Sequence, residues 1–402
     1  MHSVCSTELL ALSETPGLTY AANFWDAIAP RMVWCALLSL ALAASLPVHA
    51  QQLDPLPPQT SSYRALPQVQ LPTANPSPPA EESDDEPNPA AAVEPASVTT
   101  TDSLGNIRQQ INLQGDFAVA DTVRLGLQFD QGFIYNNLPK SSGTTEEIQD
   151  VGVTSQWHPN EVLKFDAMFG VSQMGATTNP DGQSVPQAVI PVTKLQLHLT
   201  PPGGILKLDL GFKRFIFDLS PQLVANRAVR NDFVVHPEIS LPSGWRLRAL
   251  AEMGPVTSTG ESNARYNSEF TVGHKLGKES ELYSTYSMLH YAQPSNAGYF
   301  SPDLVQNIEG GWSTDVDRKA LSLSLDFGLG AGHARQHGGD TFGPWGMSAH
   351  TGSFLTWTVR PGREVRASYE YYYDQSNPAL ESAPAGPWHM SVMTLAFRWA
   401  AQ

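Results

Sequence analysis

The feature that most constrains this chain is an alternation of apolar and polar residues that begins near residue 107 and recurs to the C-terminus. Successive side chains of a β-strand point to opposite faces, so the pattern predicts strands with one apolar and one polar face. No stretch competes with the length and 3.6-residue period of a helix. The regular strands are expected at 107–117, 123–130, 163–169, 195–199, 206–212, 245–253, 266–272, 321–327, 365–373 and 393–399, and less regular ones at 148–157, 230–240, 281–291, 304–312 and 347–359.

The connections between these strands alternate in length. Short ones lie at 120–121, 158–160, 201–204, 242–244, 277–278, 315–318 and 361–362, and longer polar ones near 134–146, 173–187, 216–228, 256–262, 292–303, 336–346 and 375–387. Tight turns at the periplasmic rim and long loops at the other rim are typical of outer-membrane barrels. The sequence therefore predicts an all-β fold, a transmembrane antiparallel up-and-down β-barrel.

The same parity predicts the strand count. Fifteen strands follow residue 107, and a chain that enters from the periplasm and ends there needs one more ascending strand. The weak stretch 96–103 (ASVTTTDS) supplies it, which gives about 16 strands over 96–402, with 14 as the alternative. A tilted spanning strand needs roughly ten residues, which fits a barrel of this length.

The N-terminus carries an apolar run, residues 32–50, that ends in Val48-His49-Ala50 before polar Gln51 and Gln52. Small residues at the positions that a signal peptidase reads, after an h-region too short to span a bilayer, predict a secretory signal peptide within a leader of residues 1–50. Both of the chain's 2 cysteines lie in this leader. Cleavage after Ala50 would leave a mature chain without a thiol.

Residues 51–95 are predicted to be a disordered, Pro-rich, acidic tether in the periplasm. The stretch 51–100 holds 11 of the 32 prolines and the acidic cluster 81–86, and such a composition buries too little apolar surface to offset its ordering entropy. Residues 1–100 carry −8 of the net charge of −15. This acidity excludes a strongly basic nucleic-acid binder, so no nucleic-acid partner is expected.

No linear motif of an enzyme occurs. The chain has no His-Glu-x-x-His, no Gly-x-Ser-x-Gly and no phosphate-binding loop, and its 11 histidines lack the spacing of metal ligands. We therefore expect no catalytic residue, no cofactor and no metal. An outer-membrane lipid hydrolase stays open as an alternative, because a Ser and a His that meet across strands leave no linear motif.

Charged residues of both signs fall on the polar faces of the predicted strands. If the apolar faces contact lipid, these charges line the lumen, where they either form a hydrated conduit suited to sugar hydroxyls or pair with one another and fill the barrel. A mixed lining argues against strong selection for one ionic sign. The residues expected there are Arg108, Asp116, Arg124, Asp130, Lys164, Asp166, Lys194, Lys207, Asp209, Lys213, Arg246, Arg248, Glu252, Arg265, Glu269, Asp326, Arg366, Glu370 and Arg398.

One loop carries a resemblance to a known family. The segment 286–291 (YSMLHY) is followed by a polar loop and by Gly298, Tyr299, Phe300, Ser301, Pro302 and Asp303. This order resembles the Gly-Tyr-Phe/Tyr-Ser-Pro-Gln loop motif in the C-terminal barrel of the cellulose synthase operon protein C family, with Asp303 where the family commonly has Gln. The alternative interpretation is a glycine-started turn before a new strand, with Tyr299 and Phe300 as interface aromatics.

The resemblance implies a function for the barrel. Family members are sixteen-stranded outer-membrane porins that pass a nascent exopolysaccharide, so it implies passive export of a cellulose-like polymer with an inner-membrane glycan synthase as partner. The family's periplasmic tetratricopeptide array has no counterpart here, since no 34-residue period is present. The periplasmic scaffold would then be a separate protein.

Two further partners and one further alternative follow from the residues. Phe397 and Trp399 resemble the terminal aromatic signal read by the barrel-insertion machinery, although Ala400, Ala401 and Gln402 follow them. The apolar faces imply contact with outer-membrane lipid. The competing hypothesis for function is a structural or adhesion barrel whose lumen is closed.

Overall fold

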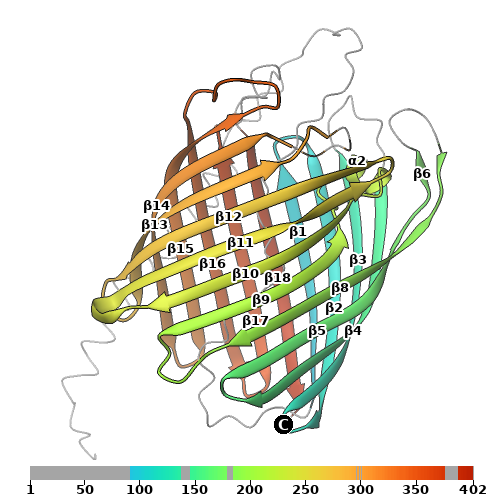
Figure 1. The fold of residues 1–402 in the computed structure, drawn as a ribbon. Helices are drawn as coiled ribbons and strands as arrows, with labels where there is room; N and C mark the ends of the chain where they lie inside the picture. The colour runs from blue at the N-terminus through green and yellow to red at the C-terminus, as the bar shows by residue number, and fades with distance from the viewer. Residues whose placement is uncertain are drawn as a thin grey trace, which may run out of the picture. The chain divides into compact units, whose positions relative to one another are not determined.

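The computed structural model describes residues 91–136, 145–178, 184–295, 297, 299, 301–375 and 388–401. The expected leader (1–50) and most of the expected tether (51–95) lie outside these residues. The described chain forms a closed antiparallel barrel in the ring order β1-β18-β17-β16-β15-β14-β13-β12-β11-β10-β9-β8-β5-β4-β3-β2, together with a small β6-β7 hairpin (Figure 1). The predicted sixteen-stranded barrel is confirmed.

The strands are long, as spanning strands of a tilted barrel must be. Their bounds are β1 Ala91–Asp102, β2 Asn106–Ala120, β3 Val123–Asn136, β4 Thr145–Asn160, β5 Leu163–Met174, β6 Thr177–Thr178, β7 Ser184–Val185, β8 Ala188–Leu199, β9 Leu206–Ile216, β10 Val229–Ser240, β11 Trp245–Ser258, β12 Glu261–Lys275, β13 Ser280–Tyr291, β14 Leu304–Arg318, β15 Leu321–Arg335, β16 Gly346–Arg360, β17 Arg363–Asp374 and β18 Trp388–Ala401. Two short helical pieces, α2 Pro221–Ala225 and the 3-10 turn Pro242–Gly244, accompany them.

The barrel closes where the first strand pairs with the last. β1 begins at Ala91, before the expected position 96, and its register with β18 runs to Val93, skips Glu94 and Pro95, and resumes at Ala96. Proline has no N–H to give to a ladder, so Pro95 interrupts the pairing with β18 without ending the strand. This interruption conceals the start of β1 in the sequence.

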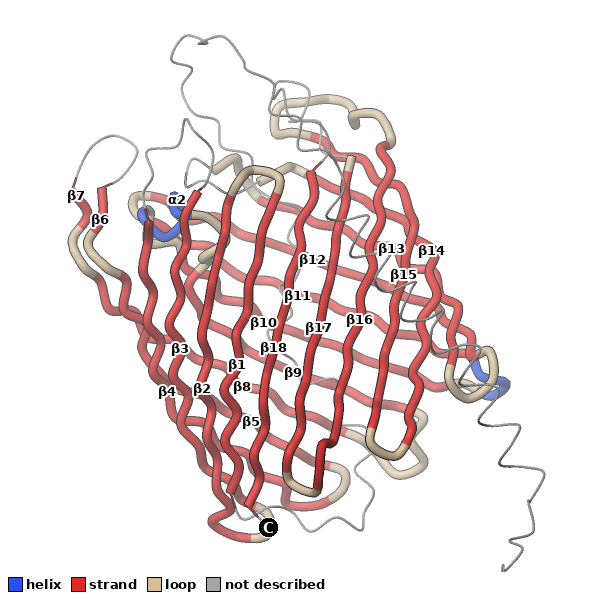
Figure 2. The backbone as a smooth tube through the Cα atoms, turned by 180° about the vertical axis from the view of Figure 1, so that it is seen from behind, coloured by secondary structure: helices blue, strands red, loops and turns tan. Residues whose placement is uncertain are grey.

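One expected loop is instead a tight turn. The sequence predicts a longer connection near 256–262, whereas β11 and β12 continue to a two-residue turn at Thr259-Gly260. Gly260 has a φ of 79°, a left-handed conformation that glycine adopts at no steric cost and that suits short hairpin turns. The other long connections lie at one rim, as expected, and are drawn as loops in Figure 2.

The outer face of the barrel is apolar. Large hydrophobic side chains that alternate with the polar residues are exposed there, among them Leu127 at 63%, Phe169 at 59% and Phe233 at 56%. Burying such side chains in hydrocarbon stabilises each by about 1.5–3 kcal/mol relative to water. This face is therefore suited to contact with lipid.

Exposed aromatics mark both ends of the outer face. Trp157, Trp245 and Trp399 are about half exposed near the rim of short turns. Their rings have an apolar body and a polar tip, which suits the boundary between lipid and water. No helix in the described residues is long and apolar enough to cross a membrane.

The β9–β10 connection, residues 217–228, packs over the interior at the rim of long loops. We call it the mouth segment. Ser220 caps α2 by accepting a hydrogen bond from the Leu223 amide at 3.3 Å, and Pro221 starts the helix. Phe217 and Leu223 join a buried cluster with Tyr291 and Tyr299, so the segment closes a small core of its own.

Candidate functional site in the barrel lumen

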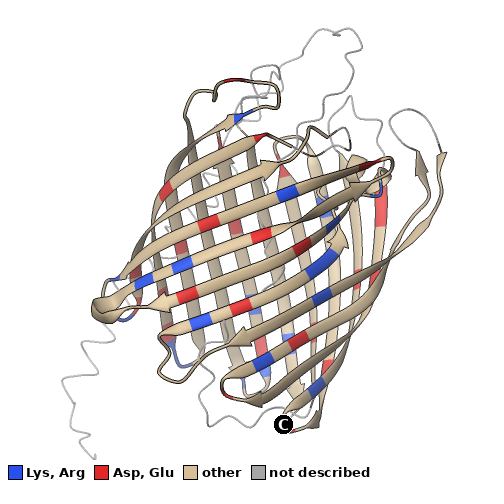
Figure 3. Cartoon of the chain, viewed as in Figure 1, with Lys and Arg blue, Asp and Glu red and all other residues tan. Residues whose placement is uncertain are grey.

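All of the charged residues expected in the lumen lie on the inward face. Each alternates with the exposed apolar residues of its strand, as Arg124 and Asp130 do with Leu125, Leu127 and Phe129. Charges of both signs occur along strands around the barrel wall (Figure 3). What the alternation does not give is the partner of each charge, which depends on the register between strands.

On the wall formed by β5, β8, β9 and β10, the partners are histidines. His198 lies between two carboxylates, with Nε2 at 3.1 Å from Asp166 and Nδ1 at 2.7 Å from Asp209. His236 Nδ1 lies 3.4 Å from the other oxygen of Asp209, and Lys164 lies 3.3 Å from Asp166. The result is a chain of ion pairs along the wall, parallel to its curvature.

The neighbouring wall continues this lateral pairing. Arg246 lies 3.5 Å from Glu238 on one side and 3.2 Å from Glu281 on the other, and Arg248 lies 2.6 Å from Glu281. Across the closure of the barrel, Arg366 on β17 lies 3.1 Å from Glu94 on β1. These charges are satisfied by adjacent strands and do not reach across the lumen.

Arg230, Asp232, Glu252 and Arg265 form what we call the buried ion cluster. Arg230 lies 2.5 Å from Asp232, and Arg265 lies 3.2 Å from Glu252 and 3.5 Å from Asp232. The side chain of Arg265 is 0% exposed. Phe217 of the mouth segment covers the cluster, since its ring centre lies 5.6 Å from the Arg230 guanidinium.

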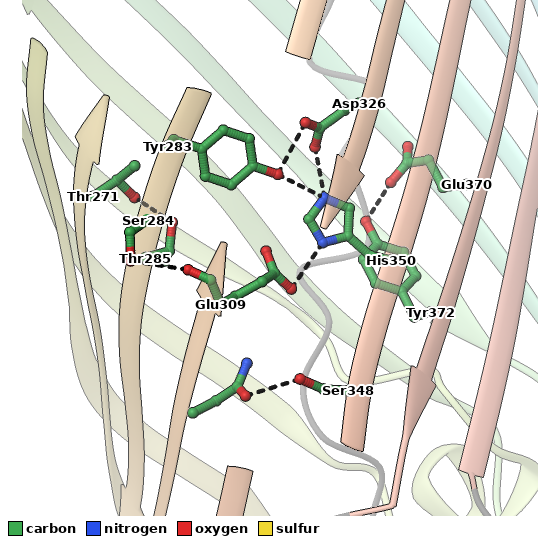
Figure 4. A network of polar contacts seen from close by, with 11 residues as sticks. Thr271, Tyr283, Ser284, Thr285, Glu309, Asp326, Ser348, His350, Glu370 and Tyr372 are labelled. Atoms are coloured by element: carbon green, nitrogen blue, oxygen red, sulfur yellow. Dashed lines mark hydrogen bonds and ion pairs between the residues drawn. The ribbon is translucent and has the colours of Figure 1, made fainter. Parts of the chain in front are cut away.

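On the wall opposite β8, a network gathers around His350 on β16 (Figure 4). His350 Nδ1 lies 3.0 Å from Glu309, and its Nε2 lies 2.6 Å from Asp326. The Tyr283 hydroxyl donates to Asp326 at 3.0 Å. We call Tyr283, Glu309, Asp326 and His350 the His350 network; it brings four neighbouring strands, β13 to β16, together on their inward face.

Beside this network lies a second acid. Tyr372 donates its hydroxyl to Glu370 at 2.5 Å, and both residues stand on the inward face of β17. Tyrosine hydroxyls and carboxylates are hydrogen-bonding groups that sugars can use, and the tyrosine ring offers an apolar surface beside them. The described residues hold no group of three or more His, Cys, Asp or Glu arranged to bind a metal ion.

The loop that resembles the family motif packs into the mouth. Tyr299 is 3% exposed and its ring lies 5.6 Å from Phe217 and 5.2 Å from Tyr291. Burial raises the pKa of Tyr299, so its phenol stays protonated and donates to Glu261. Ser301 accepts the Ser295 amide at 2.7 Å, and Pro302 is fully buried; Gly298 and Phe300 lie outside the described residues.

The mouth segment is tied to distant parts of the barrel. Asp218 forms an ion pair of 2.6 Å with Arg108 on β2, although β9 and β10 stand four strands away from β2 in the ring. Leu219 packs against the inward apolar cluster of β18. Asn226 donates to the Ala297 carbonyl at 2.9 Å, and Arg227 donates to the Gly175 carbonyl at 2.7 Å, so three loops meet.

Exposure differs between the two regions of the interior. Side chains in the buried ion cluster are at most 8% exposed beneath the mouth segment. Asp209, His236 and Asp326 are instead 38%, 40% and 42% exposed. The lumen therefore has a covered part beneath the loops and a part open to water.

The remaining expected residues lie between these groups. Arg124 pairs with Asp116, and Asp130 accepts from Gln128 at 2.7 Å. Lys207 and Glu269 are exposed on the inward face. Glu364 completes the pairing of Arg366 at 2.7 Å.

Several residues of the site escape sequence reasoning. His198, His350 and Tyr283 look like scattered polar residues, although each falls on the polar face of its strand. Asp218 and Leu219 lie in a connection without any period. Only the register and the inward turn of the mouth segment bring these side chains together.

Comparisons with known proteins give the fold. No family model matches the chain, and no curated protein matches it. Among solved structures, the chain is similar to a bacterial polysaccharide outer membrane secretin, with 11% identity over 79% of this chain and 100% of that one and a TM-score of 0.58. The barrel thus shares the fold of a bacterial outer-membrane barrel, in agreement with the resemblance to an export porin.

Other matches have lower scores. OccAB1 of Acinetobacter baumannii has 11% identity over 77% of this chain and 95% of that one, with a TM-score of 0.42. Salmonella typhi OmpF, in a complex with daunomycin, has 10% identity over 77% and 97%, with a TM-score of 0.40.

Proposed function

We propose that this protein is an outer-membrane channel that passes a polysaccharide through its lumen without a covalent step. The observation that carries the proposal is the lateral pairing of the inward charges, which leaves Asp209, His236 and Asp326 about two-fifths exposed to the interior. Charges that fill a barrel structurally would be desolvated against one another. Charges paired along the wall instead keep a hydrated surface.

The cargo we favour is an exopolysaccharide of the cellulose type. Its hydroxyls would exchange hydrogen bonds with carboxylates and guanidinium groups of the wall, and its ring faces would stack on Tyr283 and Tyr372. The loop motif at Tyr299, Ser301 and Pro302 and the fold shared with a polysaccharide secretin support this choice. The polymer would come from a glycan synthase, with a separate periplasmic scaffold.

The proposed placement follows from the two rims. The rim of short turns and both ends of the barrel chain would face the periplasm, with residues 51–90 as a tether there and the leader removed at export. The mouth segment and the 292–303 loop would face the outside. The apolar outer face would contact outer-membrane lipid, after insertion by the barrel-insertion machinery.

The test is conductance of the full chain, purified from membranes, in planar lipid bilayers. We expect discrete current steps that added cellohexaose reduces, and weaker reduction in a Y283F/Y372F double variant, which loses two hydroxyls and keeps the rings. Current steps that no oligosaccharide reduces would remove the polysaccharide from the proposal and keep the channel.

A second candidate function is favoured by the mouth segment. A barrel whose loops close it over the buried ion cluster would serve as a structural or adhesion protein. In that case neither the wild type nor a D218N variant with a loosened mouth segment would conduct.

A further inference from the structure

Two lysines stand out from the otherwise paired charges of the inner wall. Lys194 on β8 and Lys213 on β9 are direct cross-strand partners in the register. Both lie on the inward face, since His198 and Asp209, which follow the same alternation on these strands, meet there. Like charges directly opposite each other destabilise a strand pair. The arrangement therefore costs stability that other inward residues would not.

No carboxylate compensates these ammonium groups. Within the described part of the chain, neither lysine has an ion pair within 4.0 Å or a hydrogen bond, although Lys213 stands opposite Asp232 in the register with β10. Asp232 is occupied, because Arg230 lies 2.5 Å and Arg265 3.5 Å from it.

The acids on the other side are engaged in the same way. Asp166, one alternation from the partner of Lys194, is shared by Lys164 at 3.3 Å and His198 at 3.1 Å. Met168 is the residue directly opposite Lys194 on β5 and brings no charge.

The charge balance gives the sign of the missing partner. The buried ion cluster contains two guanidinium groups and two carboxylates, so it is neutral as a unit, and Lys194 and Lys213 add two positive charges beside it. The next inward position on β9 is Gly211, whose missing side chain leaves the wall low on that side. An anionic group could therefore approach both ammonium groups from the lumen.

We propose that Lys194 and Lys213 form an anion-binding subsite of the lumen, which takes the carboxylate or phosphate group of an acidic sugar. The lysines are point charges with three donors each, which suits an oxyanion shared between them. This inference rests on the proposed channel function and narrows its cargo to a polysaccharide that carries acidic groups.

The experiment measures block of the channel current by hexagalacturonate, with cellohexaose as the neutral probe and inorganic phosphate as the free anion. We expect hexagalacturonate to block the wild type more strongly than cellohexaose does. A contact of about 1 kcal/mol per charge in water corresponds to about fivefold, so K194Q and K213Q should each weaken this block by about that factor.

Matched variants keep the result specific. Lys207→Gln removes the same charge from an exposed position on β9, and its block should equal that of the wild type. The K194R/K213R variant should retain the block, because the charges stay. Folding of each variant is read from heat-modifiable migration on gels.

Each outcome decides. Equal block of K194Q, K213Q and the wild type by hexagalacturonate would overturn the subsite while leaving the channel intact. Block by phosphate but not by hexagalacturonate would overturn the acidic sugar as its ligand. A wild type without current would instead contradict the proposed function itself.

Discussion

Arg265 carries a full charge at a position without solvent exposure. Its guanidinium is stabilised by Glu252 and Asp232, which are themselves 3% and 1% exposed. Removing one partner of such a pair leaves uncompensated charge in the interior, which is more costly than the pair is favourable.

We therefore expect R265M to lower the free energy of unfolding by about 3–5 kcal/mol, measured by urea unfolding in lipid vesicles. The exposed pair of Arg318 and Glu279 is the control, because its side chains are 50% and 45% exposed. R318M should change the same quantity by less than about 1 kcal/mol. Equal losses in both variants would contradict this account of burial.

Gly254 tests packing at the level of one atom. A Cβ at this position would lie 1.7 Å from the Asn231 carbonyl oxygen, which belongs to the β10 backbone and cannot rotate away. We expect G254A to destabilise the barrel by at least about 2 kcal/mol and to lower the folded fraction on gels. Gly175 has open space around it, so G175A should fold like the wild type.

At the level of elements, the mouth segment is a short connection held by few contacts. Its ion pair between Asp218 and Arg108 and its contact between Leu219 and the β18 cluster fix it across the interior. Four buried hydrophobic residues of the segment and its neighbours supply the rest: Phe217, Leu223, Val224 and Ala228. Such an element can be displaced without unfolding the strands.

Asp218→Asn should therefore widen the channel. A charge-assisted hydrogen bond contributes about 1.5 kcal/mol, so its loss raises the population of the displaced segment by about tenfold. The expected result is a higher single-channel conductance with an unchanged barrel, as judged by gel migration. E279Q, at the rim of short turns, should leave the conductance as it is; a conductance of D218N at or below that of the wild type would argue against the mouth segment as a constriction.

The strands were within reach of the sequence because their period of two is local. Turns such as 121–122 and 361–362 were predicted for the same reason, since their residues interrupt the alternation directly. The mouth segment was not, because the partners of Asp218 and Leu219 lie on β2 and β18, more than a hundred residues away. The tight turn at 259–260 was missed because polar residues at its strand ends resemble a loop.

The candidate site divides in the same way. Alternation alone puts Asp166, Asp209 and Asp326 on the polar face, and the structure puts them on the inward face. Their pairing with His198 and His350 depends on inter-strand register, which no single strand encodes. The exclusion of Lys194 and Lys213 from any pair follows only after every neighbouring carboxylate has been assigned.

For the whole molecule, the lumen has mixed charge in sum but separates the signs by side. Lys194 and Lys213 stand on β8 and β9, and these strands lie half-way round the ring from β16 and β17. There the acids Glu309, Asp326 and Glu370 share one histidine, His350. A molecule in the lumen would thus meet a basic wall on one side and an acidic wall on the other.

This separation predicts opposite shifts of ion selectivity. Neutralising the acidic wall with E370Q should raise the permeability of chloride relative to potassium, because a fixed negative charge no longer repels the anion. Neutralising the basic wall with K194Q should lower it. The measurement is the reversal potential across a bilayer with a potassium chloride gradient, with E279Q as the control outside the lumen wall.

The two walls also predict how the variants combine. Sites this far apart share no partner, so the reversal potential of an E370Q/K194Q double variant should equal the sum of the two single shifts and lie near that of the wild type. A binding readout separates this from a loss of both sites, since block by hexagalacturonate should stay weak in the double variant. Shifts of the same sign in both single variants would mean that the lumen acts as one averaged field, and the separation of charge would then have no part in choosing the cargo.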